Sequence, residues 1–251
     1  KSYIMNKSEM HVICWDLDET LGHFTPIGRA MYGESVEWDN EVRIRYGIKD
    51  LLVEFSEANG FQSYITTSGV KKYAEKALRA TGLRQYFKDV HGRGTVVMPN
   101  KKVLRSNNFK NYEDVAWKSI PYDEYPSRML VIGNSTSDSP VGMPGLVTII
   151  SNYRTDAMNL REVIVQLLEK GNGDFNAGFN ALLAESQHVE REWGYEEDIF
   201  ETPGGVVLNL RNVTDEHNYP IYGEAHSIPQ IFVKSVKDTH QPVVVPFNAC
   251  S

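Results

Sequence analysis

The sequence predicts an α/β fold built on a doubly wound parallel sheet. Over residues 1–151, short apolar runs rich in β-branched residues alternate with segments whose apolar residues recur at helical spacing. Three of these runs end abruptly in an acidic, a hydroxyl or an amide residue, at Asp16, Thr66 and Asn134. Because the carboxyl ends of parallel strands meet at one edge of a sheet, we expect the functional site to lie there.

The predicted elements of this core follow in order. Val12–Trp15 forms the first buried strand, and alternating residues at 35–38 and 42–45 indicate a small hairpin within residues 22–46. Helical spacing predicts helices over residues 47–60 and 70–82 and from Lys110 onward, and apolar runs predict strands over residues 61–69, 129–132 and 146–150.

Residues 152–251 are predicted to be a C-terminal extension that packs on the core. Two apolar stripes at helical spacing lie between residues 158 and 192, and strand-like pieces follow at residues 206–210, 231–236 and 243–245. This part carries no family motif. Three roles stay open for it, which are to complete the sheet, to cover the site or to bind a partner.

The stretch Asp16-Leu17-Asp18-Glu19-Thr20 is the strongest functional signal. Residues two apart on an extended chain share a face, so Asp16 and Asp18 are expected to point at one site. Two close carboxylates repel each other, and Mg²⁺ is the cation that suits hard oxygen ligands. The alternative is an acidic turn that only solvates the sheet edge, but the apolar run before the motif and Thr20 after it favour a site.

This motif resembles the DxDxT signature of the haloacid dehalogenase (HAD) superfamily of phosphohydrolases. The sequence WDLDETL is similar to the form that this motif takes in the capless small-C-terminal-domain and magnesium-dependent phosphatase branches. The resemblance implies a HAD-like Rossmannoid core with a flap at residues 22–46. It also implies that Asp16 is the nucleophile, forming an aspartyl-phosphate, and that Asp18 is general acid and then base.

The same resemblance implies further catalytic residues. Thr66, at the end of the second strand, would bind the transferring phosphoryl group, with Thr67 and Ser68 as neighbouring substrate ligands. Ser68 is alternatively an N-cap of the helix that follows it. Lys110 would neutralise the nucleophile and the phosphoryl oxygens, and its alternative is a solvated surface lysine.

Gly133, Asn134 and Asp138 resemble the fourth motif of the family, GDxxxD, with Asn134 where Asp is commoner. The predicted Mg²⁺ site therefore consists of Asp16, Asp18, Asn134 and Asp138. An Asn oxygen can ligate Mg²⁺ but brings less charge than a carboxylate. The alternative is an ordinary polar turn at the end of a strand.

Within the flap, polar side chains are candidates for substrate contact, and each is alternatively an ordinary surface residue. The candidates are His23, Arg29, Arg43 and Arg45, and of these we predict that His23 and Arg45 bind substrate.

Charge and composition limit the alternatives. A formal net charge of −7 over 251 residues argues against a generally basic surface for nucleic acid, although nucleic acid is not excluded. No apolar run approaches the ~20 residues that a membrane span needs, and no secretory signal is visible. Cys14 and Cys250 do not suggest a disulfide framework. We expect a cytoplasmic protein, with the nucleus as an alternative.

The function predicted from the sequence is Mg²⁺-dependent phosphomonoester hydrolysis. The intervals between the motifs hold no insert large enough for a cap domain, and uncapped HAD members tend to act on macromolecules, so a phosphoprotein is the leading substrate. A nucleotide or nucleic-acid end is the alternative substrate. A non-catalytic binding module is the alternative class of protein. The feature that suggests it is Asn134, which stands where the family motif commonly has Asp.

Overall fold

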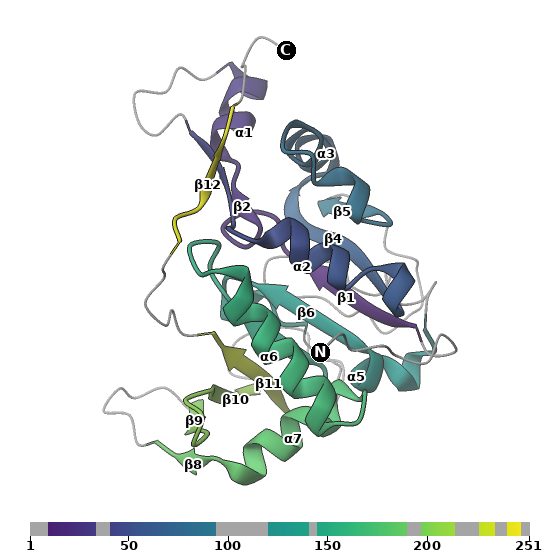
Figure 1. The fold of residues 1–251 in the computed structure, drawn as a ribbon, viewed down its shortest axis with the longest axis vertical. Coiled ribbons are helices and arrows are strands. Elements are labelled where there is room, and N and C mark those ends of the chain that lie inside the picture. The colour runs from purple at the N-terminus through teal and green to yellow at the C-terminus, as the bar shows by residue number, and fades with distance from the viewer. Residues whose placement is uncertain are drawn as a thin grey trace.

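The structure, a computed structural model, describes residues 10–33, 41–93, 120–140, 145–189, 197–213, 226–233 and 240–246. Within these ranges, a nine-stranded sheet runs in the order β5-β4-β1-β6-β7-β11-β10-β9-β8, and a three-stranded sheet, β12-β3-β2, accompanies it (Figure 1). Helices pack on the large sheet, so the predicted α/β fold class is confirmed. Lys110 and the helix predicted to begin there lie outside the described residues.

The parallel half of the large sheet carries the predicted motifs. Its strands are β5 (Val90–Arg93), β4 (Phe61–Val70), β1 (His11–Trp15), β6 (Met129–Gly133) and β7 (Val147–Ile150). β1 lies between β4 and β6, and Trp15 is the register partner of Ile65 on one side and of Ile132 on the other. This register brings the residues that follow these three positions to the same edge of the sheet.

The second half of the chain extends the same sheet. β11 (His226–Phe232) pairs in parallel with β7, and β10 (Val207–Val213), β9 (Glu197–Glu201) and β8 (Gln187–His188) continue antiparallel. Completing the sheet was one of the three roles left open for residues 152–251. β8 and β9 were not predicted, because β8 has only two residues and β9 reads Glu-Asp-Ile-Phe-Glu, with too little apolar alternation.

The flap segment, residues 22–46, contains two short strands and a helix in its described parts. Val42–Ile44 is a strand, β3, and it pairs with β2 (Gly22–His23) and with β12 (Val243–Val245). Between β2 and β3, Thr25–Tyr32 forms helix α1, which has Pro26 in its first turn, where a missing N–H costs nothing. The alternating residues at 35–38 lie outside the described residues. The pairing of residues 35–38 with 42–45 therefore stays a prediction, and helix α1 is an element that the sequence analysis did not predict.

Helices cover one face of the large sheet (Figure 1). They are α2 (Ile48–Glu54), α3 (Lys71–Ala80), α6 (Ala157–Lys170) and α7 (Phe175–Glu185), and their apolar residues share one core with Ile13, Trp15, Ile65 and Ile132. Helix α1 packs against α3 and β3 instead. The helix predicted over residues 47–60 ends at Glu54 and is followed by a single 3-10 turn, Glu57–Asn59. None of the helices within the described ranges is both long enough and apolar enough to cross a bilayer.

A smaller core lies on the opposite face of the sheet. Val12, Cys14 and Val131 pack there with Ile120 and with Tyr125 of the short helix α5 (Tyr125–Arg128), which a 3-10 turn (Tyr122–Glu124) precedes. Burial raises the pKa of the Cys14 thiol well above its usual range, so the group stays protonated and serves as packing.

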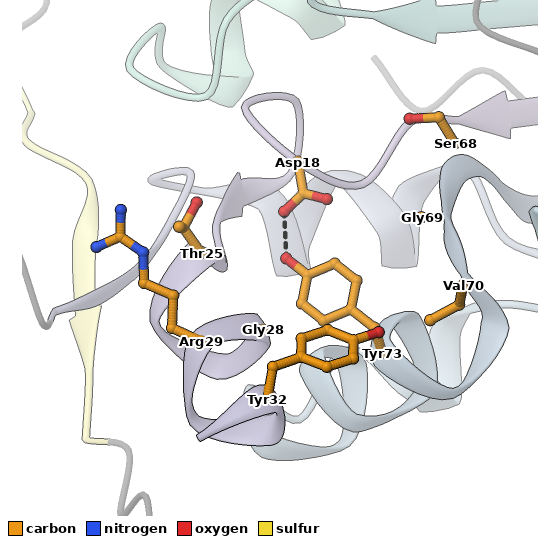
Figure 2. A pocket seen from close by; sticks show the side chains of 9 residues that line it. All are labelled: Asp18, Thr25, Gly28, Arg29, Tyr32, Ser68, Gly69, Val70 and Tyr73. Atoms are coloured by element: carbon orange, nitrogen blue, oxygen red, sulfur yellow. Dashed lines mark hydrogen bonds between the residues drawn. The ribbon is translucent and has the colours of Figure 1, made fainter. Parts of the chain in front are cut away.

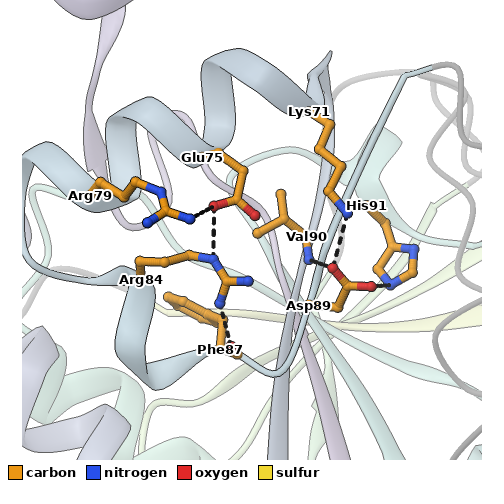
Figure 3. Close-up of polar contacts among 8 residues, drawn as sticks. All are labelled: Lys71, Glu75, Arg79, Arg84, Phe87, Asp89, Val90 and His91. Atoms are coloured by element: carbon orange, nitrogen blue, oxygen red, sulfur yellow. Dashed lines mark hydrogen bonds and ion pairs between the residues drawn. The ribbon is translucent and has the colours of Figure 1, made fainter.

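Helix α3 is fastened to the chain that follows it (Figure 3). Arg84, in the 3-10 turn Arg84–Tyr86, donates to Glu75 at 2.9 Å, and Lys71 donates to Asp89 at 3.0 Å. Burial acts to raise the pKa of Asp89, but the N–H of Val90 and the Lys71 ammonium outweigh it, and the net pKa is lowered. The start and the middle of α3 are thus held against the segment between α3 and β5, with Tyr73 of the same helix bonded to Asp18 after β1.

Candidate active site

The carboxylate of Asp16 sits at the end of β1 and is almost fully buried, with 5% of the residue exposed. Its main-chain N–H donates to the carbonyl of Ile132 at 2.8 Å, which continues the pairing of β1 with β6 by one residue. The hydroxyl of Thr20 donates to Asp16 Oδ2 at 2.9 Å. Burying a carboxylate is costly unless donors satisfy it, and Thr20 supplies one of them.

The loop after Asp16 folds back on itself. Leu21 N–H donates to the carbonyl of Leu17, and Glu19 N–H donates to that of Gly22 at 2.8 Å. Glu19 has a left-handed backbone (φ 59°), which is disfavoured for a residue with a side chain. Its carbonyl accepts from Tyr153 N–H at 2.7 Å, so the loop after β7 helps to hold this conformation.

The two flap residues predicted to bind substrate make contacts within the protein. His23 Nδ1 lies 2.7 Å from Glu19 Oε1, and its ring stacks against Tyr153. Arg45 is 1% exposed and donates to the Thr20 carbonyl at 3.0 Å and to the Ser151 hydroxyl and carbonyl at 2.8 and 2.9 Å. The prediction for Arg45 is corrected here: its guanidinium braces the loops after β1 and β7, because the surrounding carbonyls need donors once they are buried.

The motif after β6 is a tightly capped turn. Oδ2 of Asp138 accepts from the N–H groups of Asn134 and Ser135, both at 3.0 Å, and Asp138 is 1% exposed. Ser135 and Asp138 form a capping box for the 3-10 turn Thr136–Asp138, called η4. The observed contacts of Asp138 therefore orient the turn that carries Asn134. This is a different role from the one predicted for Asp138, which was to be part of the Mg²⁺ site.

The hydroxyl residues at the end of β4 occupy three different environments. Thr66 is 1% exposed, and its Oγ1 has no hydrogen-bond partner within the described ranges. Thr67 Oγ1 accepts from Gly69 N–H at 3.1 Å. Ser68 does not cap α3, because the N-cap is Val70 and no side chain bonds to the first turn, so the alternative reading of Ser68 is wrong.

A pocket of about 480 Å³ opens beside Asp18, within the size range of small-molecule sites (Figure 2). It is lined by residues from α1, from the β4–α3 junction and from α3: Asp18, Thr25, Gly28, Arg29, Tyr32, Ser68, Gly69, Val70 and Tyr73. The Tyr73 hydroxyl donates to Asp18 Oδ1 at 2.5 Å. Burial raises the pKa of Tyr73 far above its usual range, and the charge of Asp18 adds to this, so the phenol remains a donor.

Sequence reasoning missed Tyr73. Tyr73 lies in the first turn of α3, next to lysines. The local pattern shows only an amphipathic helix with a solvent-exposed face. A signal was available in the spacing, because a residue in the first turn of the helix after β4 faces the end of neighbouring β1. Arg29, a candidate that was not one of the two predicted substrate ligands of the flap, does line the pocket.

The residues predicted to form the site come from adjacent strands. Asp16 follows β1, Thr66 lies in β4, and Asn134 follows β6. These strands are neighbours in the order β4-β1-β6. Asp18 and Ser68 share the pocket, whereas His23 and Arg45 do not line it. Lys110 lies in a part of the chain that the structure does not describe.

The donor set at this edge fits a hard divalent cation. The Asp16 carboxylate, the Asp18 carbonyl and the Asn134 side chain each offer an oxygen atom, the kind of ligand that Mg²⁺ prefers. In the described parts of the chain, no group of three or more His, Cys, Asp and Glu side chains is placed to hold a metal. The set therefore depends on one amide and one main-chain oxygen, with less negative charge than an all-carboxylate site.

No family model matches the chain, and no curated protein matches it. Among solved structures, a haloacid dehalogenase-like hydrolase from Streptococcus pneumoniae is similar at 14% identity and a TM-score of 0.39, over 57% of this chain and 85% of that one. A HAD-superfamily hydrolase from Ehrlichia chaffeensis gives 14% identity and 0.42, over 64% and 98%. A hydrolase from Streptococcus pneumoniae TIGR4 gives 20% and 0.40, over 62% and 99%.

Gly133 offers a test of the turn that carries Asn134. A Cβ at this position would lie 2.3 Å from Oδ2 of Asp138, so Gly133→Ala must push the carboxylate away from the two N–H groups that it accepts from. We expect a loss of about 2 kcal/mol in the free energy of unfolding, measured with urea. Gly204→Ala is the control, because its nearest atom would be 3.8 Å away. Equal stability of the two variants would contradict this account of the turn.

Proposed function

We propose that this chain is a Mg²⁺-dependent phosphomonoester hydrolase of the HAD type that forms an aspartyl-phosphate on Asp16. The observation that carries the proposal is the meeting of three strand ends: a buried carboxylate after β1, hydroxyl residues at the end of β4, and a capped Asn turn after β6. Phosphoryl transfer depends mainly on positioning and charge stabilisation, and this arrangement supports both.

Asp16 is assigned as the nucleophile. The bond from Thr20 holds Oδ2, so we assign Oδ1 to attack phosphorus as the bond between phosphorus and the leaving oxygen breaks. In the second step, water attacks the phosphorus of the aspartyl-phosphate, the bond to Asp16 breaks, and the carboxylate and inorganic phosphate are released. Splitting one displacement in two lowers each barrier.

Asp18 is assigned as the acid and then the base. In the first step it gives its proton to the leaving oxygen, and in the second step it takes a proton from the attacking water. Its place in the wall of the pocket supports this role, since a leaving group that departs from phosphorus near Asp16 would enter that pocket. Tyr73 holds one oxygen of Asp18 and is a positioning residue.

The predicted cation has a matching place in this scheme. Mg²⁺, when bound, would offset the repulsion between the Asp16 carboxylate and the phosphoryl oxygens. We assign Asp16, the Asp18 carbonyl and Asn134 to hold it, with Asp138 fixing the Asn134 turn through the N–H groups of Asn134 and Ser135. Thr66 and Thr67 would contribute hydroxyls at the phosphoryl group, and Lys110 a positive charge.

A phosphoprotein is the proposed substrate. The pocket beside Asp18 is open, and its outer rim includes Tyr32, which is 66% exposed, and the guanidinium-bearing residue Arg29. Aromatic and arginine side chains are favoured contacts for peptides and other proteins. The short intervals between the motifs, with α1 in the flap region, support an uncapped site that a macromolecule can reach.

The first test of the function is hydrolysis of p-nitrophenyl phosphate with Mg²⁺ and with EDTA. We expect turnover only with Mg²⁺, and none from Asp16→Asn, because an amide does not attack phosphorus as a carboxylate does. Asp123→Asn, an exposed acid away from the site, is the control and should behave as wild type. Near-wild-type turnover by a folded Asp16→Asn protein would remove the covalent mechanism, and a wild-type protein without activity would favour a binding module.

Tyr73→Phe tests the positioning of Asp18. The change keeps the ring and removes the hydroxyl that donates to Asp18. We expect kcat for an alkyl phosphate to fall by roughly tenfold, because a poor leaving group needs the acid, with a smaller loss for p-nitrophenyl phosphate. Tyr32→Phe, in the same pocket, is the matched control. Equal losses on both substrates would mean that Tyr73 does not act through Asp18.

The substrate class is tested by comparing phosphopeptides with mononucleotides at matched concentrations, with p-nitrophenyl phosphate as the common reference. We expect phosphopeptides to have the higher kcat/KM, because the open rim can accept a chain on both sides of the phosphorylated residue. A hundredfold preference for mononucleotides, ~2.7 kcal/mol of transition-state stabilisation, would replace the phosphoprotein proposal with a small-substrate one.

A further inference from the structure

Three neighbouring strands of the large sheet carry a buried polar row. Thr148 of β7 is the register partner of Gln230 in β11, and Gln230 is the partner of Asn209 in β10. All three residues are 0% exposed. Neighbouring positions in register point to the same face of a sheet, so the three side chains form one continuous row. Buried amides are costly unless they are hydrogen-bonded, which raises the question of what this row binds.

The hydrogen bonds of the row lead to the turn after β6. Asn209 Nδ2 donates to Gln230 Oε1 at 3.0 Å, and Gln230 Nε2 donates to Ser139 Oγ at 2.6 Å and to the Thr136 carbonyl at 3.2 Å. Arg211, also in β10, donates to the same Thr136 carbonyl at 3.2 Å. β10 and β11, from the second half of the chain, therefore hydrogen-bond to the residues at both ends of η4 (Thr136–Asp138).

This turn connects the row to the site. Between the two hydrogen-bonded residues lies Asp138, whose Oδ2 holds the N–H groups of Asn134 and Ser135. Hydrogen bonds therefore connect Asn209 through Gln230 to the turn, the main chain of the turn leads to Asp138, and Asp138 bonds to the main chain of Asn134. The partners that orient a ligand from behind often control metal affinity nearly as strongly as the ligands do.

We propose that Gln230 is a positioning residue, through which the C-terminal strands set the place of the Asn134 turn and so the affinity of the site for a divalent cation. The metal part of this inference rests on the proposed function, whereas the anchoring of the turn stands on the contacts alone. Residues 152–251 would then contribute to the reaction without touching substrate.

Packing alone does not account for the row. Apolar residues would fill the same space without a desolvation cost, as they do at neighbouring buried positions such as Ile228 and Ile231. The row also leaves acceptor capacity unused: Thr148 Oγ1 and Asn209 Oδ1 have no hydrogen-bond partner within the described ranges. Buried polar atoms without a partner lower the stability of the fold. The hydrogen bonds of Gln230 to the turn are the favourable interactions that the row makes in exchange.

The experiment replaces Gln230 by an apolar residue of similar length. In Gln230→Met, both donors to the turn are lost while the volume is kept, and Ile231→Val, on the other face of the same strand, is the matched control. Arg211→Met removes the other donor to Thr136 from a partly exposed position, so it serves if Gln230→Met does not fold. Two readouts are taken on the full chain: amide hydrogen exchange over residues 133–139, and Mg²⁺ affinity by titration calorimetry.

We expect faster exchange in residues 133–139 and roughly tenfold weaker Mg²⁺ binding in Gln230→Met, with the same direction in Arg211→Met and neither effect in Ile231→Val. Unchanged exchange over the turn in folded variants would overturn the anchoring. Faster exchange with unchanged Mg²⁺ affinity would overturn the link to the cation. If the wild type binds no Mg²⁺ and hydrolyses no phosphate ester, the proposed function fails and the link to the cation with it, while the exchange data still decide the anchoring.

Discussion

The buried carboxylate of Asp16 is the constraint on which the rest of the site depends. A charge with 5% of its residue exposed has to be met by donors, and the chain around it is arranged to supply and hold them. Thr20 bonds to it directly, and Arg45 in turn bonds to the carbonyl of Thr20. Tyr153 holds the strained Glu19 in between. The loop that bears the acidic pair is therefore held for electrostatic reasons, by groups from two other loops, one after β3 and one after β7.

Much of the core could be predicted from sequence because local pattern and burial agree there. The runs that became β1, β4 and β6 are apolar and β-branched, and parallel strands buried on both faces require that. The polar residues at their ends were found for the same reason, since the pattern breaks where a strand reaches solvent. For the candidate site, the sequence could therefore predict which strand ends lie next to one another.

The remaining features depend on tertiary contacts that no local pattern encodes. Arg45 looks like any flap arginine, and only the partners around Ser151 decide that it is buried. Tyr73 looks like a helix residue until α3 is placed beside β1. Gln230 lies in a strand that contains Pro229, and its partners Thr136 and Ser139 are more than 90 residues earlier in the chain. Helix α1 was missed because its eight residues compete weakly with the alternation around them.

The small sheet has a consequence for how the protein is made. β3 takes one neighbour from the first strands of the chain and its other neighbour, β12, from residues 243–245. His240 adds to this join, stacking on Tyr46 and bonding to Asp156 at 2.9 Å. On a ribosome, residues 42–44 emerge long before their partner exists, and an unpaired strand edge invites other chains. The flap region therefore reaches its final pairing only late in synthesis, and until then the edge of β3 that β12 will cover stays open.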